Sequence, residues 1–216
     1  MQDTANQRMD TDSRQEQIAR AALKLAENGL RAVTVTAVAE AVGLVPSALY
    51  RHFKSRSDIL RAAFGLLRTM LLSNLEASST EPDALLGLER FWKRHLALIQ
   101  SNGAVPRIIF SEDIAGQGSP FREMLIKGQD AMIAGIAGIM AQGQRAGRIR
   151  DDVDPKDLAV LFLGQILLPA HMFFLRRGEF DLEAQVGRNW NIFREMLAPR
   201  DIPVEESPCE SVQSIA

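Results

Sequence analysis

The clearest structural pattern in the sequence lies in residues 34–60, TVTAVAEAVGLVPSALYRHFKSRSDIL. Thr34 is a favourable N-cap, because its hydroxyl can accept a hydrogen bond from a free backbone N–H of the first helical turn. Four apolar residues then recur at helical spacing and form one face: Val35, Val38, Ala39 and Val42. Gly43 predicts the end of this helix, since glycine readily takes the left-handed conformation of a helix C-terminus.

A second short helix is expected after the turn. Pro46 suits its first turn, where the missing N–H is not needed. Leu49 and Phe53, four residues apart, predict its inner face. The opposite face presents Pro46, Ser47, Tyr50, Arg51 and Lys54, with His52 near its edge. Ser55 and Asp58 have the spacing of a capping box that starts a third helix.

Two helices joined by a glycine-containing turn, with an aromatic and basic outer face, form the sequence pattern of a helix-turn-helix. A closer resemblance rests on Ile18, Ala21, Ala22, Leu25, Glu27, Gly29, Thr34, Val38, Ala39, Val42, Gly43, Leu49, Tyr50, Phe53 and Lys54. In these residues the chain resembles the DNA-binding domain of the TetR/AcrR (tetracycline-repressor-like) transcriptional regulators. The resemblance covers residues 14–61 and is most specific in LYRHFKSRSDIL, residues 49–60. The remainder matches only in being helical and of the expected length.

The resemblance implies that the second short helix lies in the DNA major groove. It makes Ser47, Ala48 and Arg51 the candidate base readers, and a guanidinium such as that of Arg51 can pair bidentately with guanine. The candidate phosphate contacts are Tyr50, His52, Lys54, Thr34 and Thr36. For any one of these side chains, an ordinary surface role is about as plausible as a contact with DNA.

Two positions depart from the family pattern. Val45 stands where the family usually has serine or threonine, and Pro46 where it often has a cation. A capping hydroxyl and one phosphate contact are therefore missing. Pro46 can compensate by pre-setting the first turn, and Val45 can pack against a thymine methyl group.

Charge is distributed unevenly along the chain, whose net charge is −2. Residues 14–61 carry eight basic and four acidic side chains, whereas residues 62–216 carry 16 basic and 20 acidic ones. A basic N-terminal module on an acidic body fits DNA binding by the first module. The imbalance involves few charges, so the motif carries most of this argument.

The length and periodicity predict an all-α protein of 216 residues. We expect a disordered N-terminus at 1–12, a three-helix DNA-binding domain at 13–55, a helical ligand-binding and dimerisation domain at 56–199 and a disordered tail at 200–216. The sequence shows no signal peptide and no uninterrupted apolar run of membrane-spanning length. Its single cysteine, Cys209, suits a reducing cytoplasm. We therefore expect a cytoplasmic protein that does not bind membranes.

The last two predicted helices are expected to form a homodimer, since helix-turn-helix proteins usually pair to read palindromes. The predicted interface consists of Leu158, Leu161, Leu168, Leu182, Val186, Trp190, Phe193 and Leu197. The alternative is that these residues form a core within one chain, and the family resemblance favours the dimer.

The middle helices are expected to enclose a pocket for an apolar or amphipathic effector. The candidate walls are Phe64, Leu67, Phe91, Trp92, His95, Ile99, Phe110, Met124, Met132, Ile136 and Gln165. Most of these residues would equally suit a plain core, and His95 and Gln165 are the better polar anchors. Effector binding is expected to move the long helix that starts at Arg56 and so to release DNA, although the sequence also allows a co-repressor.

Other functions receive less support from the sequence. An enzyme is disfavoured, because the three histidines lack metal-ligand spacing and no Gly-rich phosphate loop or Gly-x-Ser-x-Gly motif occurs. Glu112 and Asp113 could bind a cation, but a solvated helix end explains them better. No cofactor is expected. A ligand-independent DNA-binding or architectural protein is the main alternative, and a cavity of a few hundred Å3 would argue against it.

Overall fold

The structure is a computed structural model that describes residues 2–103 and 118–200, together with Val105, Ile108, Ser111, Ile114 and Gly116. Side chains are described from residue 12 onward. All regular elements in these residues are helical, which confirms the predicted all-α class. Phe110, Glu112, Asp113 and the tail after Arg200, including Cys209, lie outside the described residues.

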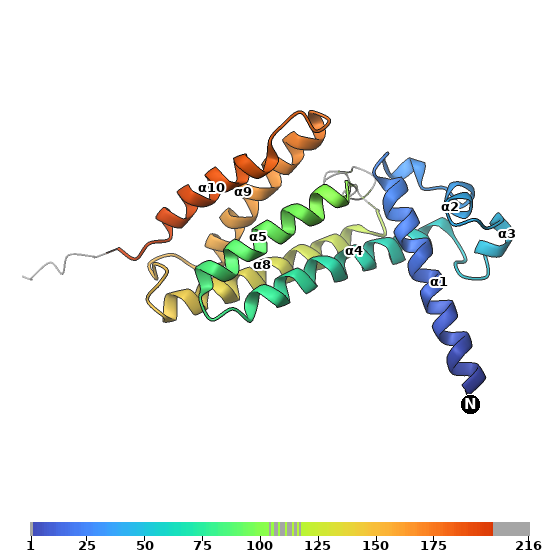
Figure 1. Cartoon of the computed structure of the whole chain (residues 1–216), viewed down its shortest axis with the longest axis horizontal. Helices are drawn as coiled ribbons and strands as arrows, with labels where there is room; N and C mark the ends of the chain where they lie inside the picture. Colours follow the sequence, from blue (N-terminus) through green and yellow to red (C-terminus); the bar gives the residue numbers. More distant parts are fainter. Residues whose placement is uncertain are drawn as a thin grey trace, which may run out of the picture.

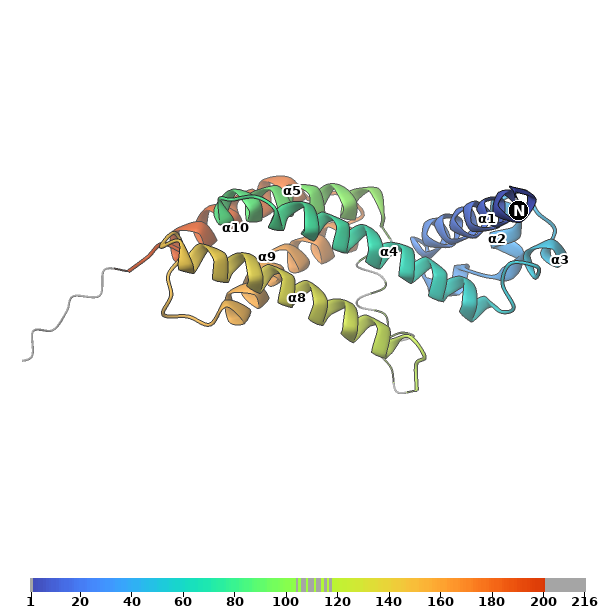
Figure 2. The same cartoon turned by 90° about the horizontal axis from the view of Figure 1, so that it is seen from below.

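The chain forms an N-terminal unit and a larger helical body (Figure 1). The unit contains α1 (Gln2–Ala26), the short 3-10 helix η1 (Leu30–Ala32), α2 (Val35–Ala41) and α3 (Pro46–Leu49). The body contains α5 (Ala84–Ser101), α8 (Arg122–Arg145), α9 (Pro155–Leu175) and α10 (Leu182–Met196). Helix α4 (Arg56–Ser79) leaves the unit and continues along the body, as Figures 1 and 2 both show.

Side-chain caps start most of these helices, and the predicted caps Thr34 and Ser55 are among them. Thr34 Oγ1 accepts a hydrogen bond of 3.1 Å from Ala37 N, and Ser55 Oγ accepts one of 3.2 Å from Asp58 N. Carboxylates cap α5, α9 and α10: Asp83, Asp154 and Asp181. Gly43 has a φ of 69°, so it ends the α2 region in the left-handed conformation that glycine favours.

Helix α1 is longer than predicted. The sequence analysis expects a disordered N-terminus at residues 1–12, whereas α1 begins at Gln2 in the structure. Residues 2–26 contain neither proline nor glycine, so no residue in this range breaks a helix. Its C-terminal half is held by the core, through Ile18, Ala19, Ala22, Leu23 and Ala26. The other half extends away from the rest of the chain in Figure 1.

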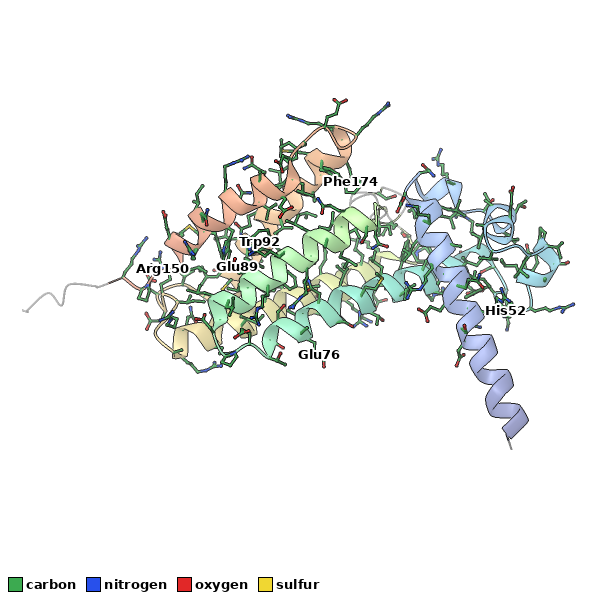
Figure 3. The ribbon with its side chains drawn as sticks, viewed as in Figure 1. His52, Glu76, Glu89, Trp92, Arg150 and Phe174 are labelled. Carbon is green, nitrogen blue, oxygen red and sulfur yellow. The ribbon has the colours of Figure 1, made fainter. Side chains whose placement is uncertain are left out.

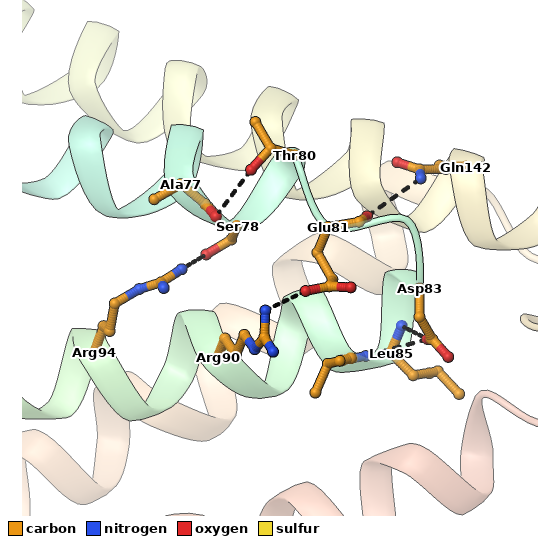
Figure 4. A network of polar contacts seen from close by, with 10 residues as sticks. Ala77, Ser78, Thr80, Glu81, Asp83, Leu85, Arg90, Arg94 and Gln142 are labelled. Carbon is orange, nitrogen blue, oxygen red and sulfur yellow. Dashed lines mark hydrogen bonds and ion pairs between the residues drawn. The ribbon is translucent and has the colours of Figure 1, made fainter.

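A polar network fastens α4 to α5 at the end of the body that lies away from the N-terminal unit. Arg94 donates from Nε to Asn74 Oδ1 at 2.8 Å and from Nη2 to the buried Ser78 Oγ at 2.6 Å. Figure 4 shows the Arg94–Ser78 bond beside an ion pair between Arg90 and Glu81. Because Asn74 and Ser78 are buried, these bonds satisfy groups that would otherwise be costly inside the body.

Two body helices bear on the sequence expectation about membranes. Helices α8 and α9 are each long and apolar enough to cross a bilayer, judged by length and composition. In the structure they pack on each other, and both contact α5. The mean hydropathy of the most apolar window in α9 is 2.0, and 33% of that window is buried within the chain. Much of its apolar surface therefore faces either a cavity or the outside.

Candidate nucleic-acid interface and internal cavity

Buried side chains hold the short helix α3 on the N-terminal unit. Leu49 is fully buried and Phe53 is 8% exposed, and both belong to the core that contains Val38 and Ala39 of α2. Helix α3 ends at Leu49, so the residues from Tyr50 onward lie in the turn that follows. That turn keeps helical hydrogen bonding, with Phe53 N donating to Leu49 O at 3.1 Å. The predicted outer face is thus split between a helix and a turn.

Most of the predicted DNA contacts lie on the surface of this unit. The exposed ones are Thr34, Thr36, Val45, Pro46, Ser47, Tyr50, Arg51 and Lys54. Val45 is 63% and Tyr50 54% exposed, which is unusual for such apolar side chains and leaves them free to contact another molecule. Ala48 is half-buried. His52 is also half-buried, and its Nδ1 is buried without a hydrogen-bond partner.

Most of the cations of this unit are already engaged by other groups of the protein. Arg20, Lys24 and Arg61 pair with the carboxylates of Glu16, Glu27 and Asp58. By contrast, no hydrogen bond or ion pair among the described residues involves Arg51 or Lys54. Both cations lie in the turn after α3 and are exposed, so they are available to phosphates and base edges.

Arg56, the first residue of α4, fixes the position of the N-terminal unit. Its Nε donates to Val33 O and its Nη2 to Leu30 O, both at 2.6 Å. These carbonyls belong to the segment between α1 and α2. Helix α4 is therefore attached directly to the elements that carry the exposed face, in addition to its packing along α1.

The body encloses a cavity of about 430 Å3 between α4, α5, α8 and α9. Its walls are mainly apolar side chains, and its polar or charged lining residues are Arg68, His95, Gln129 and Asp130. Arg68, Gln129 and Asp130 are exposed, whereas His95 is half-buried. The size and lining fall within the range of sites for small molecules.

Only some of the predicted wall residues line this cavity. Phe64, Leu67, His95, Ile99, Met124 and Met132 line it. Phe91, Trp92 and Ile136 do not, because they are buried in the core with exposures of 0%, 5% and 0%. Gln165 also lies outside the lining, and its backbone carbonyl accepts a hydrogen bond from Asn189.

Helix α9 supplies six wall residues that were not predicted from the sequence. It contributes Val160, Leu163, Gly164, Ile166, Leu167 and Ala170. The signal was present, since α9 is apolar around its circumference rather than on one stripe, and such a helix must be covered on several sides. The segment between α5 and α8 contributes Val105, Ile108 and Ile114.

His95 occupies a half-buried and well-packed position. Its ring stacks on Phe91, with centroids 5.0 Å apart and an interplanar angle of 20°. Nδ1 is buried without a hydrogen-bond partner. Burial disfavours the charged imidazolium and lowers the pKa of His95 to about 4, so the ring is neutral at pH 7. Trp92, which is labelled in Figure 3, is buried in the same core as Phe91.

The predicted dimer stripe is wrong for most of its members. Leu158, Leu182, Val186, Trp190, Phe193 and Leu197 are each at most 5% exposed, because they pack α10 on α9 within one chain. Leu161 and Leu168 are 53% and 62% exposed. Leu175 of α9 and Ile192 and Met196 of α10 are also large exposed apolar side chains, and we call these five residues together the α9–α10 face.

No three His, Cys, Asp or Glu side chains in the described part of the chain lie together in a way that could hold a metal ion.

Comparison with known proteins assigns the chain to a family. Residues 18–63 match the family model described as bacterial regulatory proteins, tetR family. The chain is also 30% identical over 155 residues to the HTH-type transcriptional repressor KstR2 of Rhodococcus jostii (strain RHA1). The matched residues cover 66% of this chain and 70% of KstR2. The chain belongs to the TetR family. It is therefore a DNA-binding transcriptional regulator and not an enzyme.

Further relatives of this TetR-family regulator differ in function. The nucleoid occlusion factor SlmA of Glaesserella parasuis serovar 5 (strain SH0165) is 28% identical over 120 residues, which cover 55% of this chain and 57% of SlmA. The transcriptional regulator FadR from Bacillus subtilis, solved in complex with stearoyl-CoA, superimposes with a TM-score of 0.70. That match is 20% identical and covers 82% of this chain and 96% of FadR, so it supports the fold.

Proposed function

We propose that this TetR-family regulator is a cytoplasmic repressor that binds a palindromic operator as a homodimer and releases it when an apolar or amphipathic effector enters the cavity. The observation that carries the proposal is the position of α4. Phe64, Leu67 and Leu71 of this helix line the cavity, while its first residue, Arg56, is bonded to the N-terminal unit. One rigid element thus connects a ligand-sized space to the DNA-binding surface.

The exposed face around α3 supports a division between base readers and phosphate contacts. Ser47, Ala48 and Arg51 are proposed to reach base edges, with Val45 against a thymine methyl group. The phosphate contacts are proposed to be Tyr50, His52, Lys54, Thr34 and Thr36. Phosphate contacts give most of the salt-sensitive affinity, whereas base contacts give the sequence preference.

The α9–α10 face supports the homodimer. Leu161 and Leu168 are large apolar side chains on a helix that is apolar on all sides, and an isologous contact would remove them from water. The corresponding helices of two protomers would then form a four-helix contact. This arrangement would also place two DNA-binding units on adjacent major grooves, which lie about 34 Å apart along one face of the duplex.

The same geometry explains how an effector would release the DNA. Its binding would shift α4 between two arrangements. An effector that fits the cavity better in one arrangement favours that arrangement by its difference in affinity. Because Phe64 and Leu67 are less than four turns from Arg56, a displacement of α4 at the cavity reaches the N-terminal unit directly. The two units would then no longer match adjacent grooves.

The chemical nature of the effector is suggested by the lining and by one relative. The walls are mostly Leu, Ile, Val, Phe and Met side chains, which suit an apolar body. The structurally similar FadR was solved with stearoyl-CoA, a molecule with a long apolar chain. These two observations favour an apolar or amphipathic ligand over a polar one.

A second candidate function is DNA binding without an effector. The similarity to the nucleoid occlusion factor SlmA favours it. The cavity of about 430 Å3 argues against it, since a body with only a structural role would be expected to fill that space with side chains.

The two candidates are separated by measuring DNA release. A fluorescent duplex from the intergenic DNA upstream of the gene is bound by the protein, and fatty alcohols, alkyl ketones, ring hydrocarbons and acyl-CoA molecules are added. We expect at least one class to lower the anisotropy of the wild-type complex. Gly128→Leu is the matched variant, because Gly128 lines the cavity and has open space where a side chain would start. We expect this variant to bind DNA but to release it less readily. DNA occupancy that none of the compounds changes would favour the ligand-independent candidate.

A further inference from the structure

Among the described residues that line the cavity, one titratable side chain lies away from its exposed rim. Arg68 and Asp130 line the cavity but are exposed, so their charges are in contact with water. His95 is half-buried on α5 and lines the same cavity. Its neighbours in the lining, such as Ile99 and Ile166, are apolar. His95 is therefore the polar group that the buried part of a ligand would meet.

Packing fixes the orientation of the imidazole. The ring stacks on Phe91, which is fully buried and in turn contacts Phe162 at a centroid distance of 5.8 Å. Phe162 is also fully buried and packs against Trp190 and Phe193 of α10. A ring held by this aromatic series presents its free edge to the cavity at low cost in conformational entropy, as a preorganised binding group does.

The hydrogen-bonding capacity of the ring is unused. Nδ1 is buried without a partner, and no hydrogen bond among the described residues involves His95. A neutral imidazole carries one donor and one acceptor. Buried polar groups in native proteins are nearly always hydrogen-bonded, and an exception calls for an explanation such as a functional role. Nδ1 is closed off from the cavity, so a ligand would meet the other ring nitrogen, Nε2, which is not buried in this way and has no hydrogen-bond partner among the described residues.

We propose that His95 determines the specificity of the cavity and that the effector is an apolar molecule with a neutral oxygen, in a hydroxyl or carbonyl group, at its buried end. This inference rests on the proposed function of the cavity. A neutral ring can accept a hydrogen bond from a hydroxyl or donate one to a carbonyl, and either group gives His95 a partner. An apolar ligand without such an oxygen leaves the ring unpaired.

A buried carboxylate fits this position poorly. Burial lowers the pKa of His95 to about 4, so the ring offers no positive charge at pH 7. An ionised group among apolar walls needs a charge partner. The cation that lines the cavity, Arg68, is at the exposed rim, where the charged end of an amphipathic effector would lie instead.

The test compares four probes of equal chain length: octane, 1-octanol, 2-octanone and octanoate. Their dissociation constants are measured by displacement of the fluorescent probe N-phenyl-1-naphthylamine from the wild-type protein and from His95→Phe. We expect the substitution to weaken the binding of 1-octanol and 2-octanone about tenfold, or ~1.4 kcal/mol, because it removes one hydrogen bond in a mainly apolar site. Octane should bind the variant as well as the wild type, and octanoate should be insensitive to the change.

Two further variants separate a hydrogen bond from a packing effect. His95→Gln keeps an amide near the outer ring nitrogen and should retain part of the preference for 1-octanol. His95→Leu removes the hydrogen-bonding group with a smaller side chain than phenylalanine. It serves as a second test in case His95→Phe does not fold.

Binding of octane together with 1-octanol and 2-octanone affinities that do not depend on His95 would overturn the inference and leave the proposed effector cavity standing. If His95→Phe and His95→Leu both lose affinity for all four probes equally, His95 only supports the fold. Failure of every probe to bind the wild type would contradict the effector cavity itself.

Discussion

At the scale of single residues, Arg51 carries the largest share of the proposed sequence preference. It is exposed, no described residue pairs with it, and it stands beside the exposed Tyr50. We expect Arg51→Ala to weaken binding to the preferred DNA by about 1–3 kcal/mol and to weaken binding to scrambled DNA much less. Arg145→Ala is the matched control, because it removes an exposed cation from the last turn of α8 in the body. Equal losses from both variants, measured by anisotropy, would show that Arg51 acts only through its charge.

His95 makes stability depend on pH. Its pKa is lowered to about 4 in the folded protein by burial, whereas the ordinary value for histidine is 6.5. Below pH 6.5 the unfolded chain binds a proton that the folded protein does not bind, so the free energy of unfolding falls as the pH falls toward 4. The contribution lost is ~3 kcal/mol by the standard conversion of a pKa difference.

Urea titrations at several pH values measure this effect. We expect the wild type to lose stability more steeply than His95→Phe between pH 6.5 and pH 4. The comparison with the variant is needed because carboxylates contribute in the same acid range. Parallel curves for the two proteins would mean that the ring is protonated in the folded state as easily as in the unfolded state.

At the scale of helices, α9 and α10 are joined by a bond that a proline makes possible. Pro169 lies inside α9 and has no N–H, so the carbonyl of Gln165, four residues earlier, lacks its usual helical partner. Asn189 of α10 donates from Nδ2 to this carbonyl at 2.9 Å. Gln185 in turn donates to Asn189 Oδ1 at 2.9 Å, which fixes the direction of the amide.

A double-mutant cycle tests this account. We expect Asn189→Leu to reduce the free energy of unfolding by about 1–3 kcal/mol, since it leaves a carbonyl without a partner. In a Pro169→Ala background the loss should be smaller, because the substituted alanine would restore the helical N–H donor. The free energies are measured by urea unfolding. Additive effects of the two substitutions would show that the carbonyl is satisfied in another way.

Local signals made much of this helical structure predictable from the sequence. Thr34 and Ser55 were predicted as N-caps because a capping side chain and the amide that it accepts from lie within three residues of each other. The start of α1 was not predictable in this way. Its first turns are polar, and polar composition alone does not distinguish a solvated helix from a disordered terminus.

At the scale of the whole molecule, the α9–α10 face is proposed to hold two protomers together. We expect Leu161→Glu with Leu168→Glu to convert a dimer into a monomer, because two buried carboxylates on each protomer would face their symmetry mates. Light scattering measures the mass, and DNA affinity should fall by at least about tenfold when one half-site is bound alone. Ile126→Glu is the control, since Ile126 is 44% exposed on α8 and lies outside this face. A double variant that remains a dimer would show that the dimer interface lies elsewhere on the molecule.

The arrangement of the body was harder to predict than its helices. Apolar residues at helical spacing show which side of a helix is buried, but not whether a core, a cavity or a partner buries it. Trp190 and Phe193 were therefore assigned to a dimer, although they pack within the chain, and Phe91 was assigned to a cavity, although it is core. The face around α3 could be predicted more fully, because it depends on residues that are close in sequence.

The central claim is that the exposed face around α3 binds a specific DNA sequence. The most direct measurement is anisotropy of the purified protein with labelled upstream intergenic DNA and with a scrambled duplex of equal length, over a range of salt concentrations. We expect tight binding to the intergenic DNA, a clear preference over the scrambled duplex, and a logarithmic salt slope of about −0.9 for each phosphate contacted. Equal, weak binding to both duplexes at every salt concentration would show that the face around α3 does not recognise a specific sequence in this DNA.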